Sequence, residues 1–468
     1  MTTPLPLLTL AQLAAQLARG DISSRELVAA CLARVDALDA RMHAFIDVYR
    51  EDALRLADAA DLERRAHAAR GPLHGIPIAL KDLFEIKGRQ TTAGSKSWLG
   101  RISDDTATCV TRLVAAGMIP LGKTHMVEFA FGGWGRNQPM GAPRNPWDAK
   151  THRVAGGSSS GSAVAVAAGM VPAALGSDTG GSIRSPASLC GITGLKPTYG
   201  LVSLHGAIPL STLLDSVGPL ARTAQDCALV TAAIAGPDAA DPATLAAPAV
   251  DLAAAAQAPV DLRGRYIACL ASEQFPAYIE EDVVRARHTA MDVLRDAGAR
   301  VEEVRAPIDF DDIAARVGKL LAAEAYGYHR AYAEDSAVPL DPWVRKRLLG
   351  GKGILAADFI ADVAAMRRAQ AGFAAWMRTY DALLTPTLPI TAKPVDTVDE
   401  AIAPLAAFTR AGNYLGACGL SLPAGFTAAG LPIGVQLLGA PFADAMLVRI
   451  GRAFQDETDW HLRHPEGV

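Results

Sequence analysis

The sequence has little of what marks a membrane protein, a disulfide-rich secreted protein or a metalloenzyme. It contains no run of about 18 uncharged apolar residues, so we expect no membrane-spanning helix. It has six cysteines in 468 residues and no C-x-x-C pair, which indicates reduced thiols in the cytoplasm rather than a disulfide framework. Its ten histidines are dispersed and form no H-E-x-x-H pattern, so we predict neither a metal site nor a bound cofactor.

The sequence also lacks an excess of charge of either sign. Lysine and arginine number 45 against 49 aspartates and glutamates, a formal net charge of −4. This balance provides no basic field that would bind nucleic acid or an anionic membrane surface. Residues 1–21 contain no basic segment before their apolar stretch, so they predict an amphipathic helix rather than a signal peptide. With 50% hydrophobic residues, the chain can bury a large core.

The order of the expected elements indicates one large α/β domain over residues 1–468. A strand at 265–271, a helix at 280–297 and a strand at 299–304 form a β-α-β pattern, which is typical of a parallel sheet. We therefore predict a mixed, mostly parallel sheet flanked by helices. Along the chain we distinguish an N-terminal helical segment (1–70), a central segment that carries the chemistry (71–235), a surface linker rich in alanine, proline and aspartate (236–264), and the rest of the sheet with further helices (265–468).

Periodicity and capping residues predict the other main elements. Gly20 ends the first helix, and Ser23 or Ser24 begins the second. A Gly-Leu-Pro turn joins two strands late in the chain. The expected ranges are helices at 9–17, 23–38, 49–69 and 443–456, a helical segment at 310–380, and a strand pair at 419–425 and 432–439.

Two clusters of glycine and serine stand out, at 156–161 and at 180–182. Glycines beside a serine let the backbone turn sharply and let other groups approach closely, because they have no Cβ. The uncharged stretch 163–168 lies between the clusters and indicates a buried connection that holds both against the core. Two hydroxyl clusters on a rigid apolar support are typical of a site for acyl-transfer chemistry.

A lysine ends a short apolar strand at 78–80. The burial of an ammonium group is costly unless the group is paired or neutralised. Two interpretations of Lys81 therefore stay open: its side chain reaches solvent, or burial lowers its pKa.

Residues 117–124 match the phosphate-loop pattern G-x-x-x-x-G-K-[ST]. That loop needs a strand before its first glycine and a helix that begins at the lysine. We expect the reverse here, a helix at 108–116 and a strand at 118–122. The order favours a buried strand over a phosphate site.

Residues 157–161 match G-x-S-x-G, the nucleophile turn of α/β-hydrolases. This interpretation makes Ser159 the nucleophile and needs a later acid and histidine, for which His205, His288 and His329 are available. The segment before the turn is a poor strand, which disfavours the interpretation.

Three motifs in this order resemble those of the amidase signature family. They are Gly75–Asp82 (GIPIALKD), Gly156–Ser162 (GGSSSGS) and Gly176–Arg184 (GSDTGGSIR). The likeness continues through Gly194–Gly200 and Leu431–Leu437, so it covers most of the chain. It implies an amidase-signature α/β fold and the cofactor-free hydrolysis of the carbon–nitrogen bond of a small-molecule amide.

The resemblance also implies catalytic roles. By position, Ser182 matches the nucleophile, Ser158 the bridging serine that follows a cis peptide bond, and Lys81 the base. A serine hydroxyl is a poor nucleophile until a base removes its proton. A lysine can be that base if desolvation lowers its pKa, and the hydroxyl of Ser158 can relay the proton because it both donates and accepts.

Further site residues follow from the same resemblance. The amides of Thr179, Gly180, Gly181 and Ser182 match the family's oxyanion hole. We expect Ser177 to support the triad, and Asp178 and Arg184 to pair and hold the loop. We also expect Phe131 and Trp134 to line the acyl pocket, and Cys190 to be buried packing.

Two functions within this family remain open. Met126–Gly135 lacks the serine, threonine and glutamate run that A subunits of amidotransferases tend to carry after Met-x-Glu-Phe, and Phe408–Asn413 resembles the corresponding segment of free-standing amidases. Our main expectation is therefore an independent hydrolase of a small amide. The alternative is the A subunit, the glutaminase, of a Glu-tRNA(Gln)/Asp-tRNA(Asn) amidotransferase complex. We expect no direct contact with nucleic acid, and the sequence leaves a homodimer open.

Overall fold

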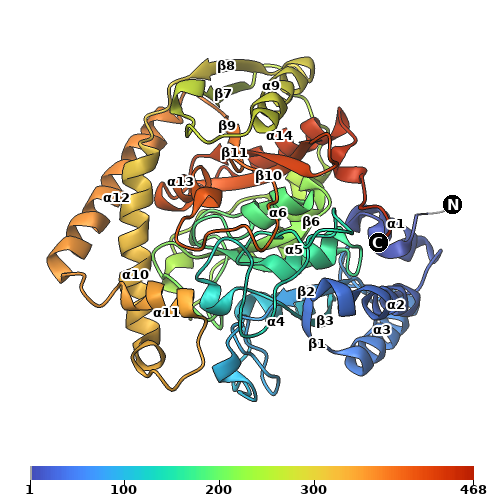
Figure 1. The fold of residues 1–468 in the computed structure, drawn as a ribbon. Helices are drawn as coiled ribbons and strands as arrows, with labels where there is room; N and C mark the ends of the chain where they lie inside the picture. Colours follow the sequence, from blue (N-terminus) through green and yellow to red (C-terminus); the bar gives the residue numbers. More distant parts are fainter. Residues whose placement is uncertain (1–2) are drawn as a thin grey trace.

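One sheet runs through the computed structural model, which describes residues 3–468 (Figure 1). Within that range the sheet has eleven strands. In their order across the sheet they are β1 (Phe45–Val48), β3 (Ile119–Thr124), β2 (Pro77–Lys81), β4 (Ala173–Asp178), β6 (Ser216–Ala221), β5 (Thr193–Lys196), β10 (Cys418–Phe426), β11 (Pro432–Gly439), β9 (Ala382–Pro386), β7 (Tyr266–Leu270) and β8 (Arg300–Val304).

A mixed sheet flanked by helices is thus confirmed, but the expectation of mostly parallel strands is wrong. Among the described residues, four neighbouring pairs are parallel, namely β2–β3, β2–β4, β7–β8 and β7–β9. The other six pairs are antiparallel. The parallel pairs lie toward the two ends of the sheet, and the β10–β11 hairpin lies in its antiparallel middle. The β-α-β pattern predicted at 265–304 is confirmed, but it describes only one end of the sheet.

Helices cover both faces and the edges of the sheet (Figure 1). They are α1 (Leu10–Arg19), α2 (Ser24–Met42), α3 (Arg50–Arg65), α4 (Thr108–Ala115), α5 (Ser160–Ala167), α6 (Arg184–Cys190), α7 (Ala224–Ile234), α8 (Leu252–Gln257), α9 (Glu281–Asp296), α10 (Phe310–Glu334), α11 (Pro342–Leu349), α12 (Ala356–Trp376), α13 (Thr409–Tyr414) and α14 (Asp444–Asp456).

The N-terminal segment is helical as predicted, apart from one strand. Thr9 and Ser23 cap α1 and α2 through reciprocal capping boxes with Gln12 and Glu26. Gly20 ends α1 with φ of 73°. The missed strand β1 is only four residues long and pairs with β3 at the edge of the sheet.

The predicted linker at 236–264 is more ordered than expected. It contains α8, in which Leu252, Ala255 and Ala256 are buried. This helix packs against α7 and α14. The segment is therefore a connection with one packed helix rather than a bare linker.

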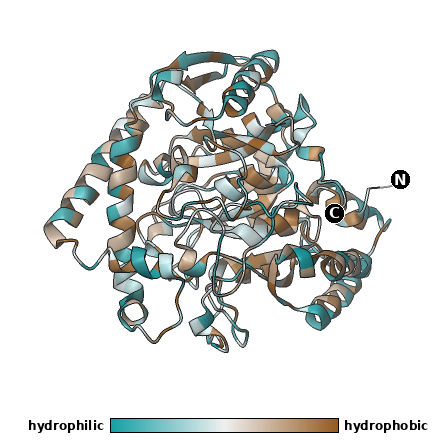
Figure 2. Cartoon of the chain, viewed as in Figure 1, coloured by the Kyte–Doolittle hydropathy of each residue, from teal (hydrophilic) through white to brown (hydrophobic). Residues whose placement is uncertain are grey.

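The predicted helical segment at 310–380 is divided into α10, α11 and α12, at the left of Figure 1. In α10, Ile313, Val317 and Leu320 recur every three or four residues and are buried. Figure 2 shows polar and apolar residues alternating along α10 and α12, as expected for helices with one packed and one solvent-facing side. Asp341 begins α11, because its carboxylate accepts a 2.9 Å bond from the Trp343 amide.

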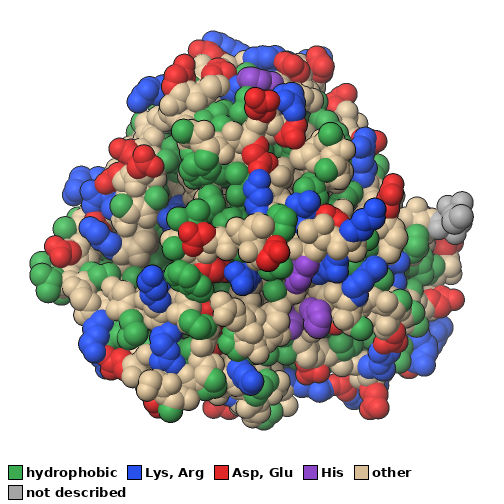
Figure 3. All heavy atoms as spheres, viewed as in Figure 1, with side chains coloured by type: hydrophobic (Ala, Val, Ile, Leu, Met, Phe, Trp, Pro, Cys, Tyr) green, Lys and Arg blue, Asp and Glu red, His purple; other side chains and the backbone are tan. Residues whose placement is uncertain are grey.

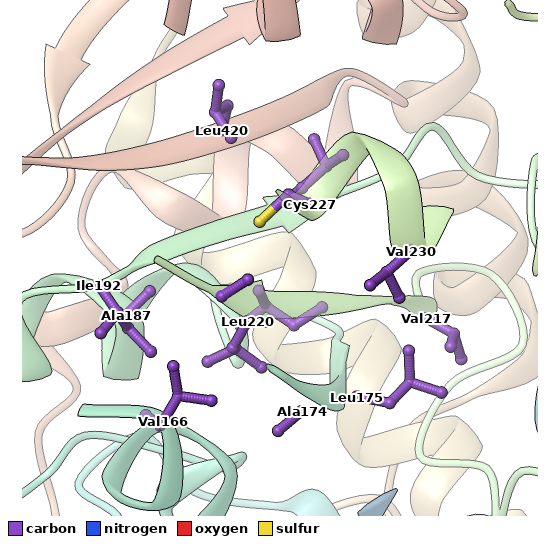
Figure 4. Packing of buried hydrophobic residues seen from close by; sticks show 14 of the residues in the cluster. Val166, Ala174, Leu175, Ala187, Ile192, Val217, Leu220, Cys227, Val230 and Leu420 are labelled. Carbon is purple, nitrogen blue, oxygen red and sulfur yellow. The ribbon is translucent and has the colours of Figure 1, made fainter. Parts of the chain in front are cut away.

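The centre of the sheet is packed with small and branched apolar side chains (Figure 4). Leu175 of β4 and Leu220 of β6 lie close to Val166 of α5 and Ala187 of α6, and all four are buried. Complete burial of one leucine side chain contributes about 1.5–3 kcal/mol to stability. This packing fixes α5 and α6, the two helices that begin at the glycine–serine clusters.

The surface drawn in Figure 3 mixes acidic and basic side chains without a large field of one sign. This agrees with the net charge of −4. No helix within residues 3–468 combines the length and the apolar character needed to cross a bilayer.

Candidate active site

Lys81 ends β2 inside the protein and does not reach solvent. Its Nζ lies 2.7 Å from Ser158 Oγ and 2.9 Å from Ser177 Oγ. Burial lowers the pKa of Lys81 to about 7, against the opposing effect of the negative charges of Asp215 and Asp178. Of the two interpretations of this lysine, the structure therefore supports the buried one.

The first glycine–serine cluster brings Ser158 to this lysine. The Gly157–Ser158 peptide bond is cis, and Ser158 is fully buried. A Cβ on Gly157 would lie 2.8 Å from the Gly135 amide nitrogen, so only glycine permits this close approach of two backbone segments. The Ser159 amide donates a 3.2 Å hydrogen bond to the Ser182 carbonyl, which joins the two clusters.

The second cluster leads from the end of β4 into α6. Gly181 has φ of 126°, and a Cβ there would lie 2.3 Å from Thr409 Oγ1, so the turn requires glycine. Gly181 also donates its amide to Asp178 Oδ1 at 2.8 Å. This bond removes Gly181 from the predicted set of oxyanion donors, since its hydrogen already has an acceptor.

The other three predicted donors are available. Among residues 3–468, no intramolecular acceptor is found for the amides of Thr179, Gly180 and Ser182. All three residues line the same cavity. Backbone amides that converge without partners are suited to bind a developing negative charge.

A buried ion pair supports this turn, as expected. Arg184 Nη2 lies 2.9 Å from Asp178 Oδ1, and both side chains are inaccessible to solvent. The charge of Arg184 holds the pKa of Asp178 well below its usual range, although burial alone would raise it. Arg184 also donates to Asn413 and Gln436, at 2.7 and 3.0 Å. The sequence analysis noted the segments that contain Asn413 and Gln436 but did not assign these contacts.

Asp215 is a buried carboxylate that the sequence analysis missed. It accepts hydrogen bonds from the hydroxyl of Thr179 and from the amides of Leu210 and Ser211 at 3.0 Å. Burial raises the pKa of Asp215 to about 6, and its negative charge favours the protonated form of Lys81. No motif in the sequence marks Asp215, because it lies in an irregular loop before β6.

A cavity of about 340 Å³ opens over the second cluster. Ser182 lines it, together with the two predicted pocket residues Phe131 and Trp134. Trp134 is 5% exposed, and its indole nitrogen donates a 3.0 Å bond to the Asp399 carbonyl. The aromatic loop is therefore one wall of the cavity.

Arg347 of α11 connects the walls of the cavity through hydrogen bonds. The sequence did not predict this role. It donates to the Phe131 carbonyl at 2.8 Å and to the carbonyl and carboxylate of Glu400, both at 2.7 Å. Three segments far apart in sequence meet at this one side chain. Its charge is balanced by Glu400.

The competing motifs have ordinary structural roles. Lys123, the phosphate-loop lysine, lies in β3 and pairs with Asp82 at 3.1 Å in the interior. Ser159 is buried, and its hydroxyl donates to the Ser177 carbonyl at 3.2 Å. Cys190 is buried and its pKa is raised by burial, as expected of packing. Residues 3–468 contain no group of three metal-ligating side chains.

Comparisons with known proteins agree on one family. The family model described as Amidase matches residues 26–448. The A subunit of the glutamyl-tRNA(Gln) amidotransferase of Roseiflexus castenholzii is 42% identical over 99% of this chain and 98% of its own length. The peptide amidase of Stenotrophomonas maltophilia superposes with a TM-score of 0.84 at 33% identity, covering 98% of each chain. An inhibitor-bound vestigial protein complex, described as revealing the evolutionary origins of an s-triazine catabolic enzyme, contains a chain that superposes with a TM-score of 0.88 at 32% identity, covering 96% of this chain and 98% of the other.

Fold and family together make this protein a hydrolase of carbon–nitrogen bonds. The chain belongs to the amidase signature family, which the three motifs of the central segment predicted.

Proposed function

We propose that this protein hydrolyses an amide through a covalent acyl-enzyme on Ser182, with Ser158 and Lys81 as the proton relay. The observation that carries the proposal is the 2.7 Å bond between Lys81 Nζ and Ser158 Oγ, buried beside a cavity that Ser182 lines. A lysine with a pKa of about 7 is partly neutral at physiological pH and can accept a proton.

In the first half-reaction, Ser182 Oγ attacks the carbonyl carbon of the amide. Its proton passes to Ser158 Oγ, and the proton of Ser158 passes to Lys81 Nζ. The amides of Thr179, Gly180 and Ser182 stabilise the oxyanion, at about 3 kcal/mol for each donor. Lys81 then returns its proton through Ser158 to the leaving nitrogen, the C–N bond breaks, and ammonia or an amine departs.

In the second half-reaction, water attacks the acyl-enzyme and gives its proton to the same relay. Collapse of the second tetrahedral intermediate releases the carboxylic acid and restores the hydroxyl of Ser182. As the second intermediate collapses, Lys81 returns the proton from water through Ser158 to Ser182. The proton transfers therefore balance among the three side chains, the leaving nitrogen and water, and the scheme needs no cofactor.

A second candidate function is the hydrolysis of one amide, glutamine, by this protein as the A subunit of an amidotransferase complex. The observation that favours it is the 42% identity to the named A subunit of a glutamyl-tRNA(Gln) amidotransferase, over nearly the full length of both chains. This candidate uses the same serine chemistry but passes the ammonia on within a complex. Relatives therefore favour it over the free-standing hydrolase that the sequence motifs suggested.

The deciding experiment measures ammonia or amine release by the purified chain alone. The substrates are glutamine, short aliphatic amides, aryl amides and a peptide amide, with Ser182→Ala as the inactive control. Turnover of a non-glutamine amide by the wild type only favours the free-standing hydrolase. Slow release from glutamine alone favours the amidotransferase role, and equal release by Ser182→Ala refutes the assignment of the nucleophile.

A further inference from the structure

Arg410 lies where the catalytic cavity meets a second, outer groove. It occupies the second position of α13 and lines both the cavity of about 340 Å³ and the adjoining groove of about 640 Å³. Its Cγ would lie 3.4 Å from a Cβ built on Gly180, so the side chain passes directly beside the glycine turn. The side chain therefore lies at the junction of the catalytic cavity and the outer groove, and its guanidinium donates to the Ala314 carbonyl on the groove side.

Among residues 3–468, no carboxylate pairs with the positive charge of Arg410, although Asp309 and Asp311 line the outer groove. Its hydrogen bond to the Ala314 carbonyl is long, at 3.4 Å. Burial and the nearby charge of Arg347 lower the pKa of Arg410, which indicates a desolvated cation that an anion would stabilise.

The other cation of the cavity is already committed. Arg347 pairs with the Glu400 carboxylate and also donates to the Phe131 carbonyl, so its charge is already balanced within the protein. The two arginines thus differ in one respect that matters for a ligand. Arg347 has a carboxylate partner, and Arg410 has none among residues 3–468.

We propose that Arg410 binds a carboxylate on the acyl part of the substrate, so that the preferred substrates are short amides with an anionic end. This inference rests on the proposed function, because it places the scissile amide at Ser182. A guanidinium is suited to bind a carboxylate through two parallel hydrogen bonds. The modest volume of the cavity, which Ser182 and Arg410 both line, favours small monoamides of dicarboxylic acids over larger anions.

The kinetic test compares matched amides. Succinamate and glutaramate carry the carboxylate, and butyramide and valeramide have the same chain lengths without it. We expect Arg410→Gln to lower kcat/KM for the two anionic amides by about 10- to 100-fold and to leave the neutral amides nearly unchanged. Arg410→Lys, which keeps the charge, should recover part of the loss.

The matched control is Arg305→Gln. Arg305 lines the outer groove but not the catalytic cavity, so the same substitution there should not change the preference. An equal loss for anionic and neutral amides in Arg410→Gln would overturn the proposal, because Arg410 would then act by positioning the Gly180 turn. Unchanged kinetics with both kinds of amide would overturn it as well.

A binding measurement keeps the inference testable if no amide is hydrolysed. Succinamate and glutaramate are titrated by calorimetry into Ser182→Ala and into Ser182→Ala/Arg410→Gln. If these amides bind Ser182→Ala, and bind Ser182→Ala/Arg410→Gln at least about tenfold more weakly, the result supports the carboxylate site, even if the proposed hydrolysis fails. No binding to Ser182→Ala, or equal binding to both proteins, refutes the site.

Discussion

The buried position of Lys81 predicts how activity depends on pH. Catalysis needs the neutral amine, and burial lowers the pKa of Lys81 to about 7. We expect kcat/KM to be constant on the alkaline side and to fall tenfold per pH unit below about pH 7. At pH 5 the neutral fraction is about one hundredth, so the rate should be about 100-fold below the plateau.

Substitution of Asp215 should shift the acid limb of the pH profile without replacing a residue of the proposed relay. The negative charges of Asp215 and Asp178 both raise the pKa of Lys81, and that of Asp215 has the larger effect. Asp215→Asn should therefore lower that pKa and shift the acid limb to lower pH by about one unit. Asp215 has a pKa of about 6 itself, so its protonation removes this charge and makes the wild-type limb less steep below pH 6; the 100-fold loss at pH 5 is therefore an upper limit.

The assay is kcat/KM from ammonia release between pH 5 and 9 in buffers of constant ionic strength. Asp58→Asn, which removes an exposed carboxylate, is the control and should leave the profile unchanged. Circular dichroism at each pH separates loss of activity from unfolding. A rate that stays flat to pH 5, or a limb that moves to higher pH in Asp215→Asn, would refute the role of neutral Lys81.

The remaining predictions concern the nucleophile, the ion pair and the thiols. Ser182→Ala should abolish turnover, and Ser158→Ala should lower kcat by about 10²- to 10⁴-fold. Ammonia release measures both effects, and full activity in either variant contradicts the role of the replaced serine. Arg184→Met should lower the free energy of unfolding by about 3–5 kcal/mol in urea titrations, because it leaves a buried carboxylate unpaired; a change below about 1 kcal/mol contradicts this. All six cysteines are buried, so an aromatic disulfide reagent should label none in the native protein and six after denaturation; a fast-reacting native thiol would contradict the burial.

The sequence predicted which side chains meet at the candidate site better than it predicted the topology of the sheet. Lys81, Ser158 and Ser177 belong to motifs whose residue types have few other uses at those spacings, and the structure brings them together. Strand direction is different, because it depends on how elements far apart in sequence meet. The order β4–β6–β5–β10 reverses direction at each step, and no local pattern encodes that order.

The walls of the cavity could not be read from the sequence for the same reason. Phe131 was predicted because it precedes the bridging serine where the family places pocket residues, whereas no residue pattern marks Arg347 or Arg410 as part of the cavity. Their roles depend on the packing of α11 and α13 over the catalytic turn. Asp215 likewise acquires its influence on Lys81 only through burial, which is a property of the assembled core.

The register of the sheet explains why the proposed relay comes from one part of the chain, although the cavity walls come from two. Strands β2 and β4 are parallel, with Leu80 opposite Leu175, so their carboxyl ends meet at one edge. Lys81 and Ser177 follow at that edge, and the serine turns begin there. Every residue of the proposed relay therefore comes from 81–182, while α10, α11 and the segment before α13 cover it from the second half of the chain. Substitutions in those later segments can change which amide is bound and leave the relay intact, which is why exchange of Arg410 should alter substrate preference but not the pH limb set by Lys81.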